Sequence, residues 1–159
     1  MSQSNIKGRK TDKLSILKTA VMLTFAATLS LAEQSEDGLK RPGIQISDGE
    51  PATFTKVLNV VANFTRGMSA KGEMLEIGIV AFNAGINLLR PDNSPVNDRV
   101  NSMSESIPDL TFSACANTIA GIARNEGSAP PISKYAWVVP SGVGRLMVLD
   151  DAGCYVVRQ

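Results

Sequence analysis

The sequence contains no histidine among its 159 residues and has only two cysteines, Cys115 and Cys154. The absence of histidine excludes a Ser-His-Asp triad, histidine-based acid and base catalysis and histidine-rich metal sites. Gly142 and Gly144 do not complete a dinucleotide or P-loop fingerprint, so phosphate binding has no support. We therefore expect no metal and no cofactor, and any chemistry must use other groups.

Charged and aromatic residues are also sparse, at 19% and 5% of the chain. Sixteen Lys and Arg residues nearly balance fifteen Asp and Glu residues, for a net charge of +1. This balance gives no electrostatic reason to expect binding to nucleic acid or to an anionic membrane surface. With 43% hydrophobic residues, the composition is globular, and the length allows one domain with a short extension.

The sequence also lacks a hydrophobic run of the roughly 20 residues that a membrane-spanning helix needs. The shorter stretch at residues 19–32, TAVMLTFAATLSLA, has 14 apolar or small residues. Small residues at Ser30 and Ala32 stand three and one positions before a possible cleavage point. Residues 1–13 carry four basic residues, namely Lys7, Arg9, Lys10 and Lys13, and Lys18 directly precedes the stretch. This order is typical of a secretory signal peptide, which we assign to residues 1–32.

The leader also predicts where the protein works. The basic region holds no Arg-Arg pair, so we expect export by a Sec-type route and a periplasmic or secreted location. An uncleaved leader would anchor the protein, and we expect no other membrane contact. The alternative is a buried helix of the domain, but the segment is apolar all round and lacks the alternating charge of an amphipathic helix.

Without residues 1–32, the chain keeps 11 basic and 14 acidic residues, for a net charge of −3. A weakly acidic domain is not expected to bind nucleic acid. Residues 33–42 are polar and charged without periodicity, which predicts a flexible lead-in. The domain itself is then expected to occupy residues 43–159.

Strand and helix patterns alternate along this domain. Short apolar or alternating segments predict five strands, at residues 43–47, 75–82, 110–115, 135–139 and 155–157. Apolar residues spaced by three and four predict four helices, at residues 53–66, 96–104, 116–124 and 143–151. Gly67 is expected to end the first of them. This order predicts an α/β domain with a mainly parallel five-stranded sheet and right-handed crossovers.

The two cysteines are expected at opposite edges of this sheet. Cys115 ends the third predicted strand and Cys154 begins the fifth. In a parallel sheet, the length of a strand, roughly 17 to 20 Å, would then separate the two sulfur atoms. A disulfide needs Cα atoms within about 7 Å, so we expect no bridge between them. We expect Cys154 to be a small buried apolar side chain.

Cys115 lies where open α/β sheets bind ligands, at the carboxyl end of a strand. The free N–H groups and the dipole of the helix that follows would stabilise a thiolate and lower the pKa of Cys115. Asn117 and Thr118 in the first turn could hydrogen-bond a bound sulfur species. The alternative is that Cys115 is simply a buried core residue.

The ends of the other strands offer polar groups to the same edge. Asp48 follows the first predicted strand, Asn83 and Gly85 follow the second, and Ser141 follows the fourth. We expect Asp48, Asn83 and Gly85 to contribute to a binding site beside Cys115. For Asp48, a role in the turn or as a helix cap is the alternative.

Several segments of the domain match the motifs of a known family in their order. They are ISDGEP at 46–51, KVLN at 56–59 with Asn63, IGIVAFNAGINLL at 77–89, DNSPV at 92–96, FSACANT at 112–118 and VVPSGV at 138–143. In these segments the sequence resembles the DsrE/DsrF-like sulfur-relay family. One difference stands out: Asn83-Ala84 occupies the place where many relatives have His-Gly.

The resemblance implies a three-layer α/β sandwich that assembles into trimers or hexamers and carries persulfide sulfur on a cysteine. Only Cys115 matches the cysteine of the family motif. We therefore expect an exported sulfur carrier or sulfurtransferase that exchanges sulfur with a donor or acceptor protein. The alternative is a non-catalytic oligomeric or small-ligand-binding module with the same fold. Whether the protein is an enzyme stays open between the two.

Overall fold

The computed structural model describes residues 39–159. The predicted signal peptide and the lead-in before Leu39 lie outside these residues. Strands and helices alternate in the part that is described. The elements are β1 (Pro42–Ile46), α1 (Pro51–Ser69), β2 (Ile77–Ala81), the 3₁₀ helix η1 (Asn83–Leu89), α2 (Asn97–Ser106), β3 (Leu110–Cys115), α3 (Ala116–Glu126), β4 (Ala136–Val139), α4 (Gly142–Asp151) and β5 (Tyr155–Arg158).

The five strands form one parallel sheet in the order β4-β3-β2-β1-β5. Its central strand, β2, has the sequence IGIVA and is buried at every position. Such an apolar run is what a strand covered on both faces requires. The predicted α/β fold with a five-stranded parallel sheet is confirmed.

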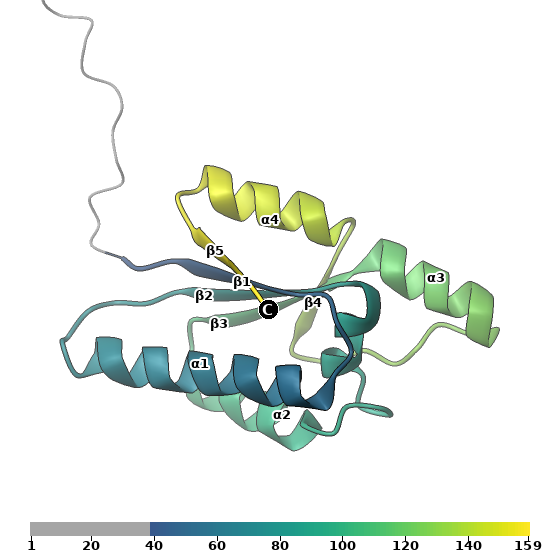
Figure 1. The fold of residues 1–159 in the computed structure, drawn as a ribbon, viewed down its shortest axis with the longest axis horizontal. Helices are drawn as coiled ribbons and strands as arrows, with labels where there is room; N and C mark the ends of the chain where they lie inside the picture. The colour runs from purple at the N-terminus through teal and green to yellow at the C-terminus, as the bar shows by residue number, and fades with distance from the viewer. Residues whose placement is uncertain (1–38) are drawn as a thin grey trace, which may run out of the picture. The chain divides into compact units, whose positions relative to one another are not determined.

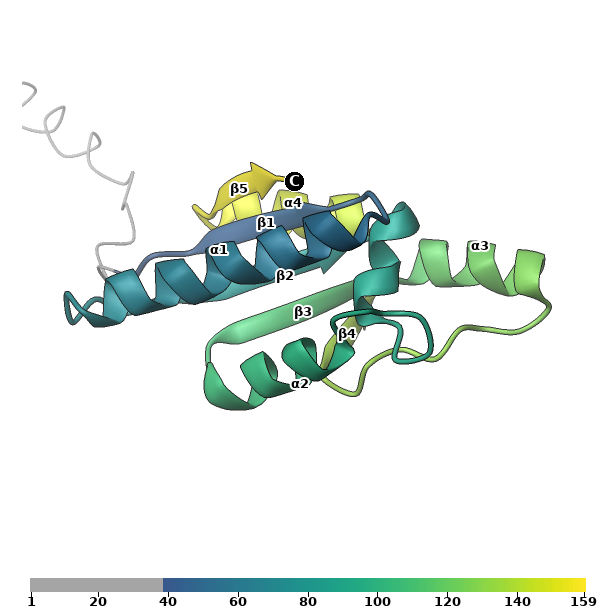
Figure 2. The same cartoon turned by 60° about the horizontal axis from the view of Figure 1, so that its bottom comes forward.

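Helices α1 and α2 cover one face of the sheet, and α4 covers part of the other (Figures 1 and 2). The main core lies under α1, where Phe54, Val57, Leu58 and Val61 follow the three-and-four spacing of one helical face and are all buried. Each such side chain contributes about 1.5 to 3 kcal/mol on burial. This apolar stripe packs α1 against the sheet.

A smaller core lies on the other face, under α4. Val80 of β2 packs there with Leu146 and Leu149 of α4 and with Cys154. Cys154 precedes β5, while Cys115 ends β3 at the opposite edge of the sheet, and both are buried and free. The predicted placement of the two cysteines is therefore confirmed.

The predicted end of the first helix at Gly67 is wrong. Helix α1 continues through Gly67 to Ser69, and the chain turns at Gly72, which has φ +69°. Gly67 faces open space, so it disturbs no contact. A single exposed glycine costs a helix only about 1 kcal/mol relative to alanine. The apolar stripe of α1 outweighs that cost.

Helix α3 departs from the usual layering of an α/β sheet. It has no buried residue and extends away from the sheet at its carboxyl edge (Figure 2). Trp137 of β4 pairs in register with Ser113, and Ser113 with Val80, so Trp137 shares the face of the sheet that α4 covers. It is nevertheless 74% exposed. Because α3 does not cover this face, it instead forms a wall beside the carboxyl ends of the strands, where Cys115 lies.

Candidate functional site

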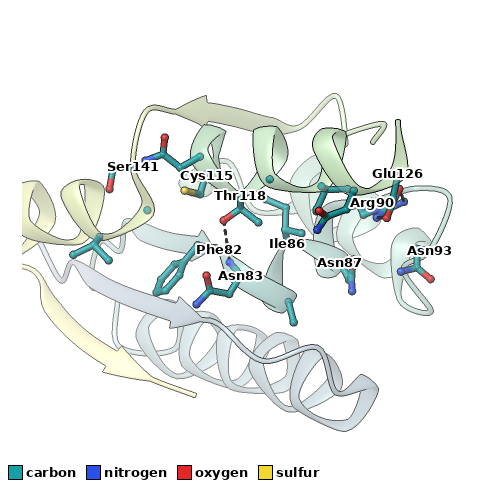
Figure 3. A pocket seen from close by; sticks show the side chains of 17 residues that line it. Phe82, Asn83, Ile86, Asn87, Arg90, Asn93, Cys115, Thr118, Glu126 and Ser141 are labelled. Carbon is teal, nitrogen blue, oxygen red and sulfur yellow. Dashed lines mark hydrogen bonds and ion pairs between the residues drawn. The ribbon is translucent and has the colours of Figure 1, made fainter. Parts of the chain in front are cut away.

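A cleft of about 720 Å³ opens at the carboxyl edge of the sheet. Residues from η1, α3 and the N-terminus of α4 line it, as Figure 3 shows. Its apolar lining includes Phe82, Ile86 and Ile122, while amide and hydroxyl side chains supply much of the rest. A volume of this size accommodates a small organic ligand.

Cys115 lies at one end of this cleft. It is the last residue of β3 and the N-cap of α3, with extended backbone angles (φ −75°, ψ 116°). An N-cap residue stands before the free N–H groups of the first helical turn. The direct passage from β3 into α3 therefore places the thiol at the positive end of the helix.

The surroundings of Cys115 favour its ionised form. Burial opposes ionisation, since Cys115 is only 5% exposed. The Thr118 hydroxyl and the backbone N–H groups of Thr118, Gly142 and Asn117 favour the thiolate, and together they outweigh burial and lower the pKa of Cys115. By contrast, burial and the nearby charge of Glu76 raise the pKa of Cys154. Of the two thiols, Cys115 is thus the one prepared to act as a nucleophile.

Thr118 is held in place by the loop on the other side of the cleft. Its Oγ1 accepts a hydrogen bond from the backbone N–H of Asn83, with an N···O distance of 3.0 Å (Figure 3). Asn83 has φ +49°, the left-handed conformation that asparagine tolerates better than most residues. Because the oxygen of Thr118 accepts from Asn83, its own hydrogen is free to point at the sulfur of Cys115.

The third N–H group comes from a different helix. Gly142 is the first residue of α4, and Ser141 caps that helix by accepting from Gly144 N at 3.1 Å. A Cβ on Gly142 would lie 2.8 Å from the ring of Phe82. Only glycine therefore lets the start of α4 come this close, so that its N–H reaches Cys115.

The structure places some of the residues that we predicted for this site in the cleft and others outside it. Cys115, Asn117 and Asn83 line the cleft, whereas Asp48 and Gly85 are not among the residues that line it. Asp48 accepts from the backbone N–H of Glu50 at 3.0 Å, which is the alternative role in the turn. Its carboxylate therefore fixes the turn between β1 and α1.

Gly85 is buried and serves the close approach of two segments. A Cβ at this position would lie 2.3 Å from the carbonyl oxygen of Ile46. Glycine therefore allows η1 to pack against the end of β1. In this way Gly85 supports the wall of the cleft, and with it the position of Asn83.

The far end of the cleft carries an ion-pair network that sequence reasoning missed. Arg90, which is 8% exposed, donates to Asp92 at 2.9 Å and to Glu126 at 3.0 Å. The hydrogen bond to Asp92 and then that to Glu126 raise the pKa of Arg90, and the bond from Arg90 lowers the pKa of Asp92. The contact between Arg90 and Glu126 ties the C-terminal end of α3 to the segment that follows η1.

Sequence reasoning also missed most of the polar lining. Besides Asn83 and Asn117, three further asparagines line the cleft: Asn87, Asn93 and Asn125. They stand in three different segments, so no motif or period links them in the sequence. Within residues 39–159, no group of three or more Cys, Asp or Glu residues is arranged to hold a metal ion.

The fold and the site define an α/β protein with a cysteine-containing cleft at the carboxyl edge of a parallel sheet. No protein-family model and no curated protein matches the sequence. Among solved structures, the chain is similar to MTH1491 of Methanobacterium thermoautotrophicum, a protein of unknown function. The TM-score is 0.64 at 25% sequence identity, and the match covers 76% of this chain and 99% of that one. Within residues 39–159, no helix is long and apolar enough to cross a membrane.

Proposed function

We propose that this protein is an exported DsrE-like sulfur carrier that accepts sulfur on Cys115 as a persulfide. The observation that carries the proposal is the set of donors around the thiol. The Thr118 hydroxyl and three backbone N–H groups favour the thiolate form of Cys115, and this residue lines the cleft. The resemblance in the FSACANT segment points to the same residue.

The proposed step is a displacement between sulfur atoms. The Cys115 thiolate attacks the outer sulfur of a donor persulfide, R–S–SH, and forms a new S–S bond. The S–S bond of the donor breaks, and R–S⁻ leaves with the electron pair. The proton stays on the transferred sulfur, so Cys115–S–SH is the product. The reverse step, with an acceptor thiolate, unloads the carrier.

This step suits a protein without histidine. The lowered pKa of Cys115 favours the thiolate nucleophile, and the leaving group departs as a thiolate, so the step places little demand on a general acid or base. Asn83 supplies no imidazole, but its backbone N–H fixes the Thr118 hydroxyl that faces the thiol.

Mass spectrometry tests the proposal directly. The purified protein is incubated with inorganic polysulfide, and its intact mass is measured under non-reducing conditions. We expect the gain of at least one sulfur atom, reversed by a reducing agent. Cys115→Ser should abolish the gain, and the matched variant Cys154→Ser should keep it. A gain that does not depend on Cys115 would contradict the proposal.

A binding module without chemistry is the second candidate, favoured by the small exposure of Cys115 and by the amide lining of the cleft. Thiol labelling separates the two functions. A carrier should react rapidly at Cys115 in the folded state at a pH well below the reference value of about 8.5. A module with a merely buried cysteine should stay protected until it unfolds.

We also propose that the protein forms a homo-oligomer, as its resemblance implies for a trimer or hexamer. Support comes from large apolar side chains at the surface of β4 and α4, namely Trp137, Val138, Met147 and Val148. Exposed apolar residues of this size are typical of protein interfaces. An exported carrier would also need a partner protein as sulfur donor or acceptor.

A further inference from the structure

The cleft extends along the whole of α3. Cys115 caps the helix at its start, and Glu126 is its last residue. Both line the cleft, and Figure 3 shows Cys115 toward one end and Glu126 toward the other. At 1.5 Å per residue, 11 residues span about 16 Å. An extended chain advances about 3.3 Å per residue, so four residues and one side chain fill this length.

The side chains between these two ends are suited to peptide groups. Five asparagines line the cleft, at positions 83, 87, 93, 117 and 125. None of their side-chain amides has a hydrogen bond to another group among the described residues. An amide offers both donors and an acceptor, as a peptide group does, so Asn117 and Asn125 of α3 can pair with a main chain laid along this helix.

The far end of the cleft favours a positive charge. Arg90 directs four hydrogen bonds to Asp92 and Glu126, out of the five N–H donors of a guanidinium. Few N–H donors of Arg90 are therefore left to bind a carboxylate of a ligand. Within this network two carboxylates face one guanidinium, which leaves one negative charge, and the C-terminal end of α3 adds its negative dipole. The guanidinium of Arg124 lies nearer the middle of the helix, 3.7 Å from the Cβ position of Gly121.

We propose that the cleft binds a persulfide carried on a short peptide with a free amino end. Its sulfur lies at Cys115, its peptide groups pair with the asparagines, and its ammonium group lies beside Glu126 at the far end of the cleft. This inference rests on the proposed function and names the class of sulfur donor.

The step keeps the balance already described, with R as the peptide. Cys115–S⁻ and peptide–S–SH give Cys115–S–SH and peptide–S⁻. One S–S bond breaks and one forms, and no external oxidant or reductant takes part. The peptide thiolate then takes a proton from water as it leaves.

Two synthetic donors test the inference. One is the persulfide of Gly-Gly-Gly-Cys amide with a free amino end, and the other is the same peptide N-acetylated. Sulfur transfer to the full protein is followed by mass spectrometry at donor concentrations below saturation. We expect the free peptide to react about three to five times faster, since a partly exposed ion pair supports a preference of this size.

Variants assign the preference to the far end. Glu126→Gln should bring the two rates together, and the exposed Glu73→Gln, outside the cleft, should keep the preference. Asp92→Asn is the second test, because Asp92 lies outside α3 and its loss leaves the contact of Arg90 with the helix intact. It should also reduce the preference.

The outcomes separate this inference from the proposed function. Equal rates for both peptides in the unchanged protein overturn the peptide site, while transfer from either peptide still supports a sulfur carrier. A preference that survives both Glu126→Gln and Asp92→Asn overturns the position of the ammonium group. No sulfur gain from the peptides or from inorganic polysulfide removes the proposed function, and the inference with it.

Discussion

The backbone N–H of Asn83 donates a hydrogen bond to Thr118 Oγ1 at 3.0 Å, joining residues 35 positions apart in the sequence. Through this contact η1 orients a side chain of α3. Since the same Thr118 hydroxyl lowers the pKa of Cys115, the loop after β2 influences the acidity of a thiol at the end of β3.

Thr118→Val should raise the pKa of Cys115. The variant keeps the shape of the side chain but loses the hydroxyl that favours the charged sulfur. The midpoint of the rate of Cys115 alkylation measured against pH should shift upward. Thr118→Ser keeps the hydroxyl and should retain most of the original profile. An unchanged midpoint in the valine variant would exclude the hydrogen bond as a cause.

Ionisation of Cys115 should make folding stability depend on pH. Its pKa is lower in the folded than in the unfolded chain, so the contribution is fully present above the unfolded value of about 8.5. It is lost as the pH falls through the folded value. Cys154 has the opposite sign, because its raised pKa contributes stability below the unfolded value that is lost as the pH rises.

Urea unfolding of Cys115→Ser and Cys154→Ser over a pH series separates the two contributions. Cys115→Ser should reduce the rise of the free energy of unfolding with increasing pH. Cys154→Ser should reduce the fall of the free energy of unfolding at alkaline pH. Identical slopes in both variants and the unchanged protein would show that neither thiol is linked to folding.

Gly85→Ala should destabilise the fold strongly. Its Cβ would lie 2.3 Å from the carbonyl oxygen of Ile46, so η1 or β1 must move. We expect a loss of about 2 to 4 kcal/mol in the free energy of unfolding, measured with urea. Gly67→Ala is the matched control, because Gly67 lies in α1 and faces open space. It should gain about 0.5 to 1 kcal/mol, and a similar loss in both variants would contradict the close-approach argument.

Trp137→Lys should weaken self-association. Trp137 is 74% exposed on the edge strand β4, where a charged side chain would oppose burial against a second copy. Light scattering coupled to size-exclusion chromatography should show a lower average mass than for the unchanged protein. Met74→Lys, at an exposed position before β2, serves as the control and should keep the mass. A monomeric unchanged protein would remove the proposal of an oligomer.

The sequence predicted the sheet well because its local patterns are strong. The predicted strand at residues 110–115 coincides with β3. Its boundary is clear in the sequence because an apolar run ends at Cys115 and a helical spacing of apolar residues begins directly after it. Gly67 misled the prediction of a helix end, because glycine ends a helix only where the backbone requires it. The five strands therefore followed from periodicity, whereas the end of α1 did not.

The site itself was only partly predictable. The sequence places the N-terminus of α3 directly after Cys115. The N–H of Gly142 lies near the thiol only because α4 follows β4, which is the neighbour of β3 in the folded sheet. Arg90 pairs with Glu126 across 36 positions, a distance that no local pattern reveals. Such contacts depend on three-dimensional proximity, and a single sequence does not carry that information.

The absence of buried side chains in α3 has a consequence for how the site opens. A helix that buries so little has a low free energy of local unfolding, and its amide hydrogens should exchange with solvent earlier than those of α1. Each such opening removes a wall of the cleft and two of the N–H groups that stabilise the thiolate. The lowered pKa of Cys115 and the shape of its cleft are thus lost and regained together. A ligand that spans α3 would hold the helix folded and would therefore favour the thiolate form of Cys115.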